Sequence, residues 1–273
     1  KVLFFGVNDK KLNLPQISSV ADVSYCLNCG KPLTYDFLLS AHMGHYQCST
    51  CGLKRPSPQI SASNLNFKPD YSTSLKLAIN HEPLTINYSL PGLYNVYNVL
   101  AASACVSAIN INSSFIVKSI KNFSAAFGRF QKMTVEDKEV IIFLIKNPAG
   151  ANEVIRTVSA SQGKINLLAI LNDNIADGRD VSWVWDTNWE ALAANLKSTT
   201  IAGTRAWDLA NRLKYADIRL SNNQVYEDIN NSIVKTVKTV SSKDTLVIMP
   251  TYTALLSVQK TLNKLGATKW HKD

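Results

Sequence analysis

The sequence lacks several features that would identify a function directly. It has no uninterrupted apolar run of about 18 residues, which argues against a membrane-spanning helix. It has no internal repeat and no phosphate-binding loop of the form GxxxxGK(S/T). An initiator methionine and a signal-peptide pattern are also missing, and the opening stretch 1–9 is typical of a strand entering a turn. We therefore expect the chain to begin inside a domain that has an upstream portion.

Dense clusters of basic residues are missing too, although the chain is basic overall. The 273 residues include 29 Lys and Arg and 20 Asp and Glu, for a net charge of +9. No run of five or six basic residues occurs, which argues against an arginine-rich arm. The charge still permits nucleic acid, an anionic membrane surface or a phosphorylated substrate as a partner. A solvated basic surface is the plainer interpretation.

Cysteine is scarce, but four of the five cysteines are ordered in pairs. Cys26 and Cys29, then Cys48 and Cys51, form two CxxC motifs separated by eighteen residues. Four thiolates at this spacing are typical of tetrahedral zinc, and a glycine directly after each pair suits a tight turn. We predict a structural zinc ribbon over about 24–57, because four cysteines leave no coordination position open. Two disulfides in a secreted protein are the alternative, which no other feature favours.

Three further residues of types that can bind metals, His42, His45 and Cys105, are not expected to take part in the zinc site. His42 and His45 lie between the two pairs, and we expect both at the surface because four cysteines already complete the site. Cys105 stands alone in a helix of small residues, where we expect it to contribute to packing.

Two halves of different pattern divide the chain near residues 118–128. Before that region, the ribbon is followed by a hairpin pattern at 76–90 and a small-residue helix from Pro91. After it, strands alternate with helices, which indicates a doubly wound, mostly parallel α/β sheet. We expect strands at 129–136, 138–146, 165–171 and 244–250, and helices at 150–161, 188–197, 205–216, 232–241 and 252–266.

Polar clusters follow two of the expected strands, where doubly wound sheets bind ligands. The first is KNPAG at 146–150, and the second, after the strand at 165–171, is rich in aspartate. The aspartates of the second cluster are Asp173, Asp177, Asp180 and Asp186. They are either functional carboxylates on an exposed loop or simply turn and cap residues. The nearby Trp183, Trp185 and Trp189 are either interface anchors or core residues.

Several longer motifs match a known family. The stretch LPGLYNVYNVLAA at 90–102 resembles the end of the central ATPase domain of Mur ligases. FGRFQ at 127–131, followed by a hairpin and KNPAG, resembles the opening of their C-terminal domain. Together with the inserted ribbon and NDNIADGRDVSWVWD at 172–186, the whole chain resembles the MurT family. It departs from the Mur ligase pattern at the N-terminus, because the phosphate loop of these enzymes lies upstream of the residues present.

The resemblance implies both a fold and an activity. It implies that 1–122 is part of a central domain with the inserted ribbon and that 123–273 is a doubly wound C-terminal domain. It implies a subunit of a cytoplasmic, ATP- and Mg²⁺-dependent ligase at the inner face of the bacterial membrane. The expected reaction converts D-glutamate of the lipid II stem peptide to D-isoglutamine in peptidoglycan synthesis. The expected partner in a heterodimer is a class I glutamine amidotransferase of the GatD type.

The resemblance also suggests roles for individual residues. One aspartate of the cluster is expected to complete the partner's Cys–His pair, with Asp180 and Asp186 slightly ahead of Asp173 and Asp177. Side chains expected near the nucleotide are Asn95, Asn98, Arg129, Lys146 and Asn147. For each of these, packing or helix capping is the alternative, and Arg179 and Arg205 are candidates for binding a substrate carboxylate or phosphate. A basic zinc-ribbon protein that binds nucleic acid remains the alternative function.

Overall fold

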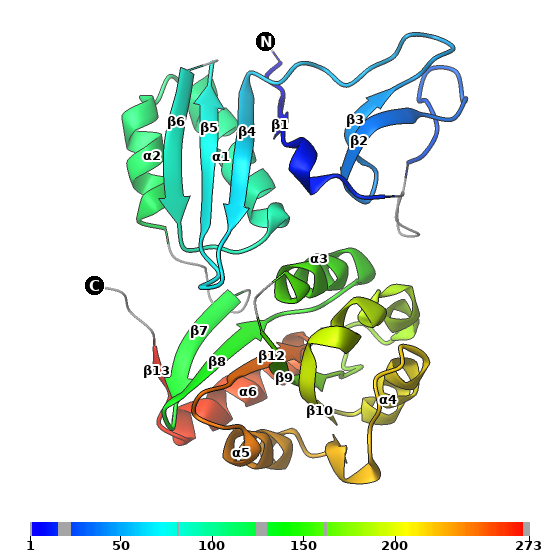
Figure 1. The fold of residues 1–273 in the computed structure, drawn as a ribbon, viewed down its shortest axis with the longest axis vertical. Coiled ribbons are helices and arrows are strands. Elements are labelled where there is room, and N and C mark those ends of the chain that lie inside the picture. Colours follow the sequence, from blue (N-terminus) through cyan, green and yellow to red (C-terminus); the bar gives the residue numbers. More distant parts are fainter. Residues whose placement is uncertain (1, 16–22, 81, 124–129, 161–162, 270–273) are drawn as a thin grey trace. The chain divides into compact units, whose positions relative to one another are not determined.

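A computed structural model describes residues 2–15, 23–80, 82–123, 130–160 and 163–269 (Figure 1). The chain divides into two compact units, residues 1–124 and 125–273. Each unit has its own sheet, and the two are described separately below.

The first unit contains a four-stranded sheet in the order β1-β4-β5-β6. β1 and β4 are parallel, whereas β4, β5 and β6 form an antiparallel meander. The expected hairpin is confirmed by β5 and β6. Helices α1 and α2 follow the sheet, and α1 confirms the small-residue helix. The bounds are β1 (Phe5–Val7), β4 (Ile60–Phe67), β5 (Thr73–Ile79), β6 (Glu82–Tyr88), α1 (Leu93–Ala108) and α2 (Ser113–Lys121).

The ribbon is inserted between β1 and β4, which are sheet neighbours. It is built on the antiparallel hairpin of β2 (Thr34–Ser40) and β3 (Met43–Gln47). A short 3₁₀ turn, η1 (Lys10–Leu12), leads from β1 toward it.

Arg55 connects the far side of the ribbon to the end of β1. Its guanidinium donates to the Val7 carbonyl at 3.3 Å and to the Asn8 side chain at 2.9 Å. It also lies against His45, whose ring stacks on Phe37 with centroids 3.8 Å apart. His45 is therefore half-buried in this contact.

Two sequence expectations in this unit are wrong. His42 and His45 are not surface residues, because both are half-buried and the Nδ1 atom of His42 is enclosed by the fold. Cys105 does not pack in the core, because its position on α1 is exposed. The buried face of α1, which includes Val96 and Leu100, does not extend to the side of the helix on which Cys105 lies.

The second unit contains a seven-stranded sheet in the order β11-β10-β9-β12-β8-β7-β13. Five neighbouring strands, β8 to β11 with β12 among them, are parallel. β7 and β13 add an antiparallel edge. The strand bounds are β7 (Phe130–Val135), β8 (Lys138–Phe143), β9 (Ile165–Ile170), β10 (Leu196–Ala202), β11 (Val225–Tyr226), β12 (Thr245–Pro250) and β13 (Thr268–Lys269).

Helices cover both faces of this sheet, as a doubly wound fold requires (Figure 1). Every residue of β9 is buried, so neither of its faces meets solvent. α5 and α6 pack against one face of the sheet, and the core between them and the strands includes Ile233, Val258 and Leu262. The helix bounds are α3 (Pro148–Ser159), α4 (Ala206–Tyr215), α5 (Ile229–Thr239) and α6 (Tyr252–Lys264), with 3₁₀ turns η2 (Ser182–Asp186), η3 (Trp189–Asn195) and η4 (Asn222–Gln224).

The longer strands and helices predicted for the second half are confirmed apart from one region, and the two-residue strands β11 and β13 were not predicted. The predicted helix at 188–197 is instead the 3₁₀ turn η3, followed directly by strand β10, which was not predicted. β10 is rich in Ser and Thr and acquires its strand conformation by pairing with β9 and β11. Within the described residues, no helix is both long and apolar enough to cross a bilayer.

Candidate functional site

The candidate site of the second unit lies at the carboxyl ends of β9, β10 and β12. The chain after β9, residues 172–188, is called the aspartate loop below. Its first residue, Asn172, is buried and joins two neighbouring strand ends. Its side-chain amide donates to Thr253 at 3.0 Å, and its carbonyl oxygen accepts from the Thr204 N–H at 3.1 Å. The loop therefore starts from a fixed point shared by the segments after β10 and β12.

Gly203 makes this convergence possible. Its φ is +110°, and a Cβ there would lie 2.3 Å from the carbonyl oxygen of Leu171 and 2.8 Å from the side chain of Asn172. A larger residue would therefore meet backbone, which cannot move aside as a flexible side chain can. The close approach of the β10 end to the aspartate loop depends on glycine at this position.

Asp173 is held by the segment after β10. Its carboxylate accepts from the Thr204 hydroxyl at 2.9 Å and forms an ion pair with Arg205 at 3.3 Å. The Thr204 hydrogen bond, together with the Arg205 guanidinium, lowers the pKa of Asp173. Arg205 also pairs with Asp208 at 2.7 Å, so its guanidinium is engaged with two carboxylates of the protein itself.

Asp177 is held by the start of α6. Its carboxylate accepts from the Thr253 N–H at 2.8 Å and also from the Thr253 hydroxyl. This places a carboxylate at the N-terminus of a 13-residue helix, where free N–H groups and the helix dipole favour negative charge. Gly178, directly after it, has a φ of +94° and completes the turn.

Asp180 is held within the loop. Its carboxylate accepts from the Ser182 N–H at 2.8 Å, at the start of η2. Hydrogen bonding from Ser182 lowers the pKa of Asp180. Asp180 thus forms a local turn with Ser182, but it is not the N-cap of η2, which is Val181 and has no side-chain cap.

Asp186 differs from the other three aspartates. It is exposed at the end of η2, and within the described residues its carboxylate has no hydrogen bond or ion pair. Its backbone carbonyl accepts from the side chain of Asn152 at 3.5 Å. Asp186 does not act as a cap of η3, because the N-cap position of η3 is Asn188 and has no side-chain cap. Asp186 is therefore the aspartate of the loop whose carboxylate is available to another molecule.

The tryptophans around Asp186 divide between core and surface. Trp189 is completely buried, and its indole N–H donates to the Val184 carbonyl at 3.2 Å. Trp183 is half-buried. Trp185 is 47% exposed and lies 5.6 Å from the exposed ring of Tyr215. The core interpretation holds for Trp189, and Trp185 presents an aromatic surface beside Asp186.

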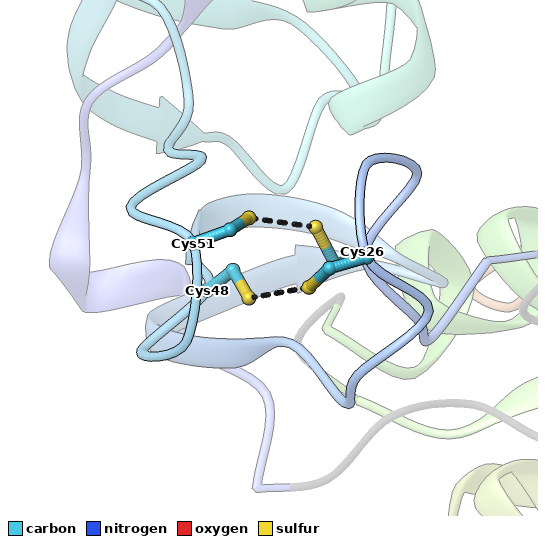
Figure 2. A group of neighbouring side chains, drawn as sticks. Cys26, Cys48 and Cys51 are labelled. Carbon is cyan, nitrogen blue, oxygen red and sulfur yellow. Dashed lines mark hydrogen bonds between the residues drawn. The ribbon is translucent and has the colours of Figure 1, made fainter.

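The cysteine cluster, Cys26, Cys29, Cys48 and Cys51, forms the second candidate site. Its four sulfur atoms all lie within 4.8 Å of one another. Figure 2 shows the side chains of Cys26, Cys48 and Cys51 turned toward a common point. The Cys26–Cys51 and Cys29–Cys48 sulfur distances are 3.4 and 3.6 Å. Tetrahedral zinc with bonds of about 2.3 Å separates its sulfurs by about 3.8 Å, so the cluster could hold a metal ion with small adjustments.

Backbone geometry prepares the cluster for a cation. Gly30 and Gly52 have φ of +69° and +75°, and each donates to the carbonyl of the first cysteine of its pair. In the second pair, N–H groups of Cys51 and Thr50 point at the sulfur of Cys48 and lower its pKa to about 6. A thiolate is the form that binds a metal, and Cys48 is the member of this pair that the backbone prepares for it, whereas the pKa of Cys51 is raised.

The residues suggested for nucleotide binding are less free than their positions imply. Asn147 caps α3 by accepting from the Gly150 N–H at 2.8 Å. Asn95 is buried and donates to the Pro91 carbonyl at 2.7 Å. Asn98 and Lys146 are exposed, and Arg129 lies outside the described residues. Asn98 and Lys146 are thus the described candidates with polar groups at the surface.

Arg212 was not among the candidate site residues predicted from the sequence, but in the structure it contacts Thr187, the residue after Asp186. It is buried on α4, and it donates to the Thr187 carbonyl at 2.8 Å and pairs with Glu190 at 2.8 Å. Its guanidinium carbon lies 5.7 Å from the centre of the Trp185 ring. Its position in an amphipathic helix gave no sign of this role, because arginines there are usually solvated.

Comparisons with known proteins point to one family. A family model described as MurT ligase C-terminal matches residues 144–255. The chain is 33% identical over 265 residues to the protein of Staphylococcus aureus (strain COL) named "Lipid II isoglutaminyl synthase (glutamine-hydrolyzing) subunit MurT". That match covers 96% of this chain and 58% of the relative, so the chain spans a little over half the relative's length.

Solved structures show the same fold. A pseudomurein peptide ligase type C from Methanothermus fervidus aligns with a TM-score of 0.70 at 22% identity, covering 96% of this chain and 53% of that one. MurF from Acinetobacter baumannii aligns with a TM-score of 0.58 at 16% identity, covering 77% of this chain and 45% of that one. The expected Mur ligase-like α/β fold is confirmed. The named relatives favour the ligase interpretation over a nucleic-acid-binding ribbon.

Proposed function

We propose that this chain, which belongs to the MurT family, is part of the ATP-consuming subunit of a glutamine-dependent amide ligase. The proposed reaction is amidation of D-glutamate in the lipid II stem peptide to D-isoglutamine, with ammonia from glutamine. The name of the S. aureus relative supports this reaction. The structural observation that carries it is the exposed carboxylate of Asp186, which has no partner within the described residues and lies beside Trp185.

Asp186 is proposed to act on the partner amidotransferase. A Cys–His pair hydrolyses glutamine efficiently only when a third group holds the imidazole tautomer and stabilises its charged form. A carboxylate that the fold leaves unpaired can accept the imidazole N–H of another subunit. The carboxylates of Asp173, Asp177 and Asp180 are each satisfied within this chain, so using them would break existing hydrogen bonds. We therefore propose Asp186 in preference to Asp180, with which the sequence had grouped it.

Trp185 and Tyr215 are proposed to contact the same partner. Their rings are exposed and lie 5.6 Å apart, close in sequence or space to Asp186. Aromatic side chains of this kind are enriched among the residues that carry binding energy at protein interfaces. The proposed assembly is a heterodimer with a GatD-type amidotransferase.

The ligase half of the reaction is proposed to use groups at a second strand end. When bound, ATP with Mg²⁺ supplies the phosphoryl group that activates the acceptor carboxylate. In this chain, Lys146 follows β8 and has an exposed ammonium group suited to a phosphate. Asn98, which lies on α1 of the first unit and not at this strand end, is a further candidate for nucleotide contact, and its amide donates to Asn95 at 3.4 Å. Asn147 and Asn95 are proposed to shape these segments through their own hydrogen bonds. Arg129 remains a proposal from the resemblance alone.

The cysteine cluster is proposed to hold a structural zinc ion. Four thiols close the coordination shell, so the site offers no open position for water or substrate. The ribbon joins β1 through Arg55, and zinc would thus stabilise an insertion that has little core of its own. We also propose that the protein works at the inner face of the membrane, where its lipid-linked substrate resides.

The experiment that tests this function measures ammonia release from glutamine by the partner amidotransferase. The assay compares the partner alone with the complex of the full-length protein, and with its Asp186→Asn variant. We expect D186N to bind the partner and to lose about 10³-fold or more of the stimulated rate. D180N and D173N serve as matched controls and should retain most of it.

Two results would contradict the proposal. Equal stimulation by D186N and the unaltered protein would remove the role in glutamine hydrolysis. A complex that hydrolyses glutamine but forms no amidated lipid II with ATP would remove the proposed substrate.

A further inference from the structure

The short segment that carries Asp186 is fixed from two helices at once. On the α3 side, the Asn152 side chain accepts from the Asn188 N–H at 2.7 Å and donates to the Asp186 carbonyl at 3.5 Å. On the α4 side, Arg212 donates to the Thr187 carbonyl at 2.8 Å. The peptide units that directly follow Asp186 are therefore held on both sides by side chains far away in the sequence.

The contacts of Arg212 extend to both neighbours of Asp186. The guanidinium lies 5.7 Å from the centre of the Trp185 ring, within the range of a cation–π contact. Arg212 is itself 5% exposed, whereas its ion-pair partner Glu190 keeps half of its side chain in solvent. A buried arginine with an exposed carboxylate partner is a weak device for stability alone, because burial of the charge offsets much of the attraction.

The segment is also braced from within. The Thr187 hydroxyl donates to the Trp183 carbonyl at 3.2 Å, and Thr187 is buried. The indole of Trp189 donates to Val184 at 3.2 Å. In contrast to this dense support of the backbone, the carboxylate of Asp186 has no partner within the described residues. The backbone is rigid where the side chain is free, which is the arrangement expected of a preorganised group.

We propose that Asn152 and Arg212 are positioning residues, which hold the Trp185–Asn188 backbone so that the Asp186 carboxylate reaches the partner's catalytic histidine in the correct orientation. The inference rests on the proposed function of Asp186. Neither residue contacts substrate, and both act through the peptide units beside Asp186. Because a displacement of about 1 Å can reduce a rate about 100-fold, loss of this support should lower turnover without preventing assembly.

The experiment measures kcat and KM for glutamine hydrolysis by the complex, together with the Kd for the partner. For Asn152→Ala we expect kcat to fall about 10- to 100-fold, with KM and Kd changed less than about threefold. Asn152→Asp keeps the oxygen that accepts from Asn188 and should recover most of kcat. The matched control is Asn195→Ala, since the Asn195 side chain also ties a 3₁₀ turn to α3, by donating to the Ser159 carbonyl at 3.3 Å, and within the described residues it has no hydrogen bond to the Asp186 segment.

Arg212→Met gives an independent arm that does not depend on Asn152. Methionine fills a similar volume, but it leaves both the exposed Glu190 and the carbonyl of the buried Thr187 without this partner, so a modest loss of stability is expected. We expect R212M to remain folded at the assay temperature and to lower kcat about 10-fold. A proportional loss of stability and activity in both variants would instead indicate a purely structural role and overturn the inference.

The outcomes separate this inference from the proposed function. If D186N has no effect on ammonia release, the proposed function of Asp186 fails, and the positioning role fails with it. If D186N abolishes stimulation but N152A and R212M both behave like N195A, the positioning inference alone is wrong. Weaker binding of the partner at unchanged kcat would identify the two residues as docking groups, which also contradicts the inference.

Discussion

The cysteine cluster and the aspartate loop each contain four side chains of one type, but the fold uses them in opposite ways. The four sulfurs converge within 4.8 Å of one another. The carboxylates instead separate, and three of them are satisfied by Thr204 and Arg205, by Thr253 and by Ser182. Thiols converge where a shared cation can neutralise them, whereas unshared carboxylates accept N–H and O–H groups of their own.

The comparison shows where a functional group can be recognised. In the cysteine cluster, function requires all four members, so spacing alone points to it. In the aspartate loop, three members build the support, and the fourth, Asp186, is conspicuous only because its carboxylate is left without a partner within the described residues. A functional carboxylate among structural ones is thus found by examining what each carboxylate contacts.

The largest expected effect tests the convergence of the cysteine cluster. Replacing Cys48 with Ser, or removing bound metal with a chelator, should unfold the ribbon, because apparent binding energies of about 10 kcal/mol for structural zinc are coupled to folding. Hydrogen exchange should become fast over 24–57 and stay slow in the second unit over 163–269. Cys105→Ser is the matched control, since that thiol is exposed and far from the cluster in sequence. Unchanged exchange over 24–57 after verified metal loss would contradict the structural role.

The next largest effect tests the anchoring of the aspartate loop. Gly203→Ala places a Cβ against the Leu171 carbonyl in a left-handed conformation, and should lower the free energy of unfolding by about 3 kcal/mol. Gly178→Ala shares the positive φ but has no atom within 4 Å of the added Cβ, so only the conformational penalty of about 1–2 kcal/mol remains. Urea unfolding of both variants measures the difference. Equal losses of unfolding free energy in the two variants would show that the close approach of Gly203 to the Leu171 carbonyl does not contribute to the penalty.

Much of the fold could be predicted because its hydrophobic patterns are local. β8, β9 and β12 are apolar runs bounded by polar turns, and α3 and α6 follow the helical period. β10 was missed because LKSTTIA is not apolar. Its buried residues, Thr199, Ile201 and Ala202, are covered only once β10 lies between β9 and β11 and contacts α4 and α5. β4 was missed for a related reason, since four of its eight residues are Ser or Asn and the adjacent Ser63 and Asn64 interrupt the alternation of apolar and polar residues.

The candidate sites show the same limit. The cysteine cluster depends on two short turns and one spacing, all visible in the sequence. The partner of Asp177 is Thr253, which lies 76 residues away, and the residues that support Asp186 come from α3 and α4. Such pairings follow from tertiary packing alone, so the sequence could name four candidate aspartates but could not separate them.

A smaller effect tests whether Asp177 is structural. Asp177→Ala removes the carboxylate that accepts from the Thr253 N–H at the start of α6, and should lower the free energy of unfolding by about 1 kcal/mol. Stimulated ammonia release should stay close to that of the unaltered protein, in contrast to D186N. Thermal unfolding and the glutaminase assay on the same preparation check both parts. Loss of activity with no loss of stability would show that Asp177 has a functional role and not a structural one.

The smallest effect tests the satisfied state of Asp173. Hydrogen bonding from Thr204, with the Arg205 guanidinium, lowers the pKa of this carboxyl in the folded protein relative to the unfolded chain. The folded state therefore holds fewer protons at mildly acidic pH, so this group stabilises the protein above the unfolded pKa of about 3.9. That contribution is lost as the pH falls through the lower folded value. The urea midpoint of the unaltered protein should exceed that of Asp173→Asn at pH 6, and the difference should shrink below about pH 4. Asp186→Asn, which removes a carboxylate with no partner within the described residues, should leave the urea midpoint at pH 6 close to that of the unaltered protein. If both variants responded alike, the contrast between satisfied and free aspartates in this loop would be lost.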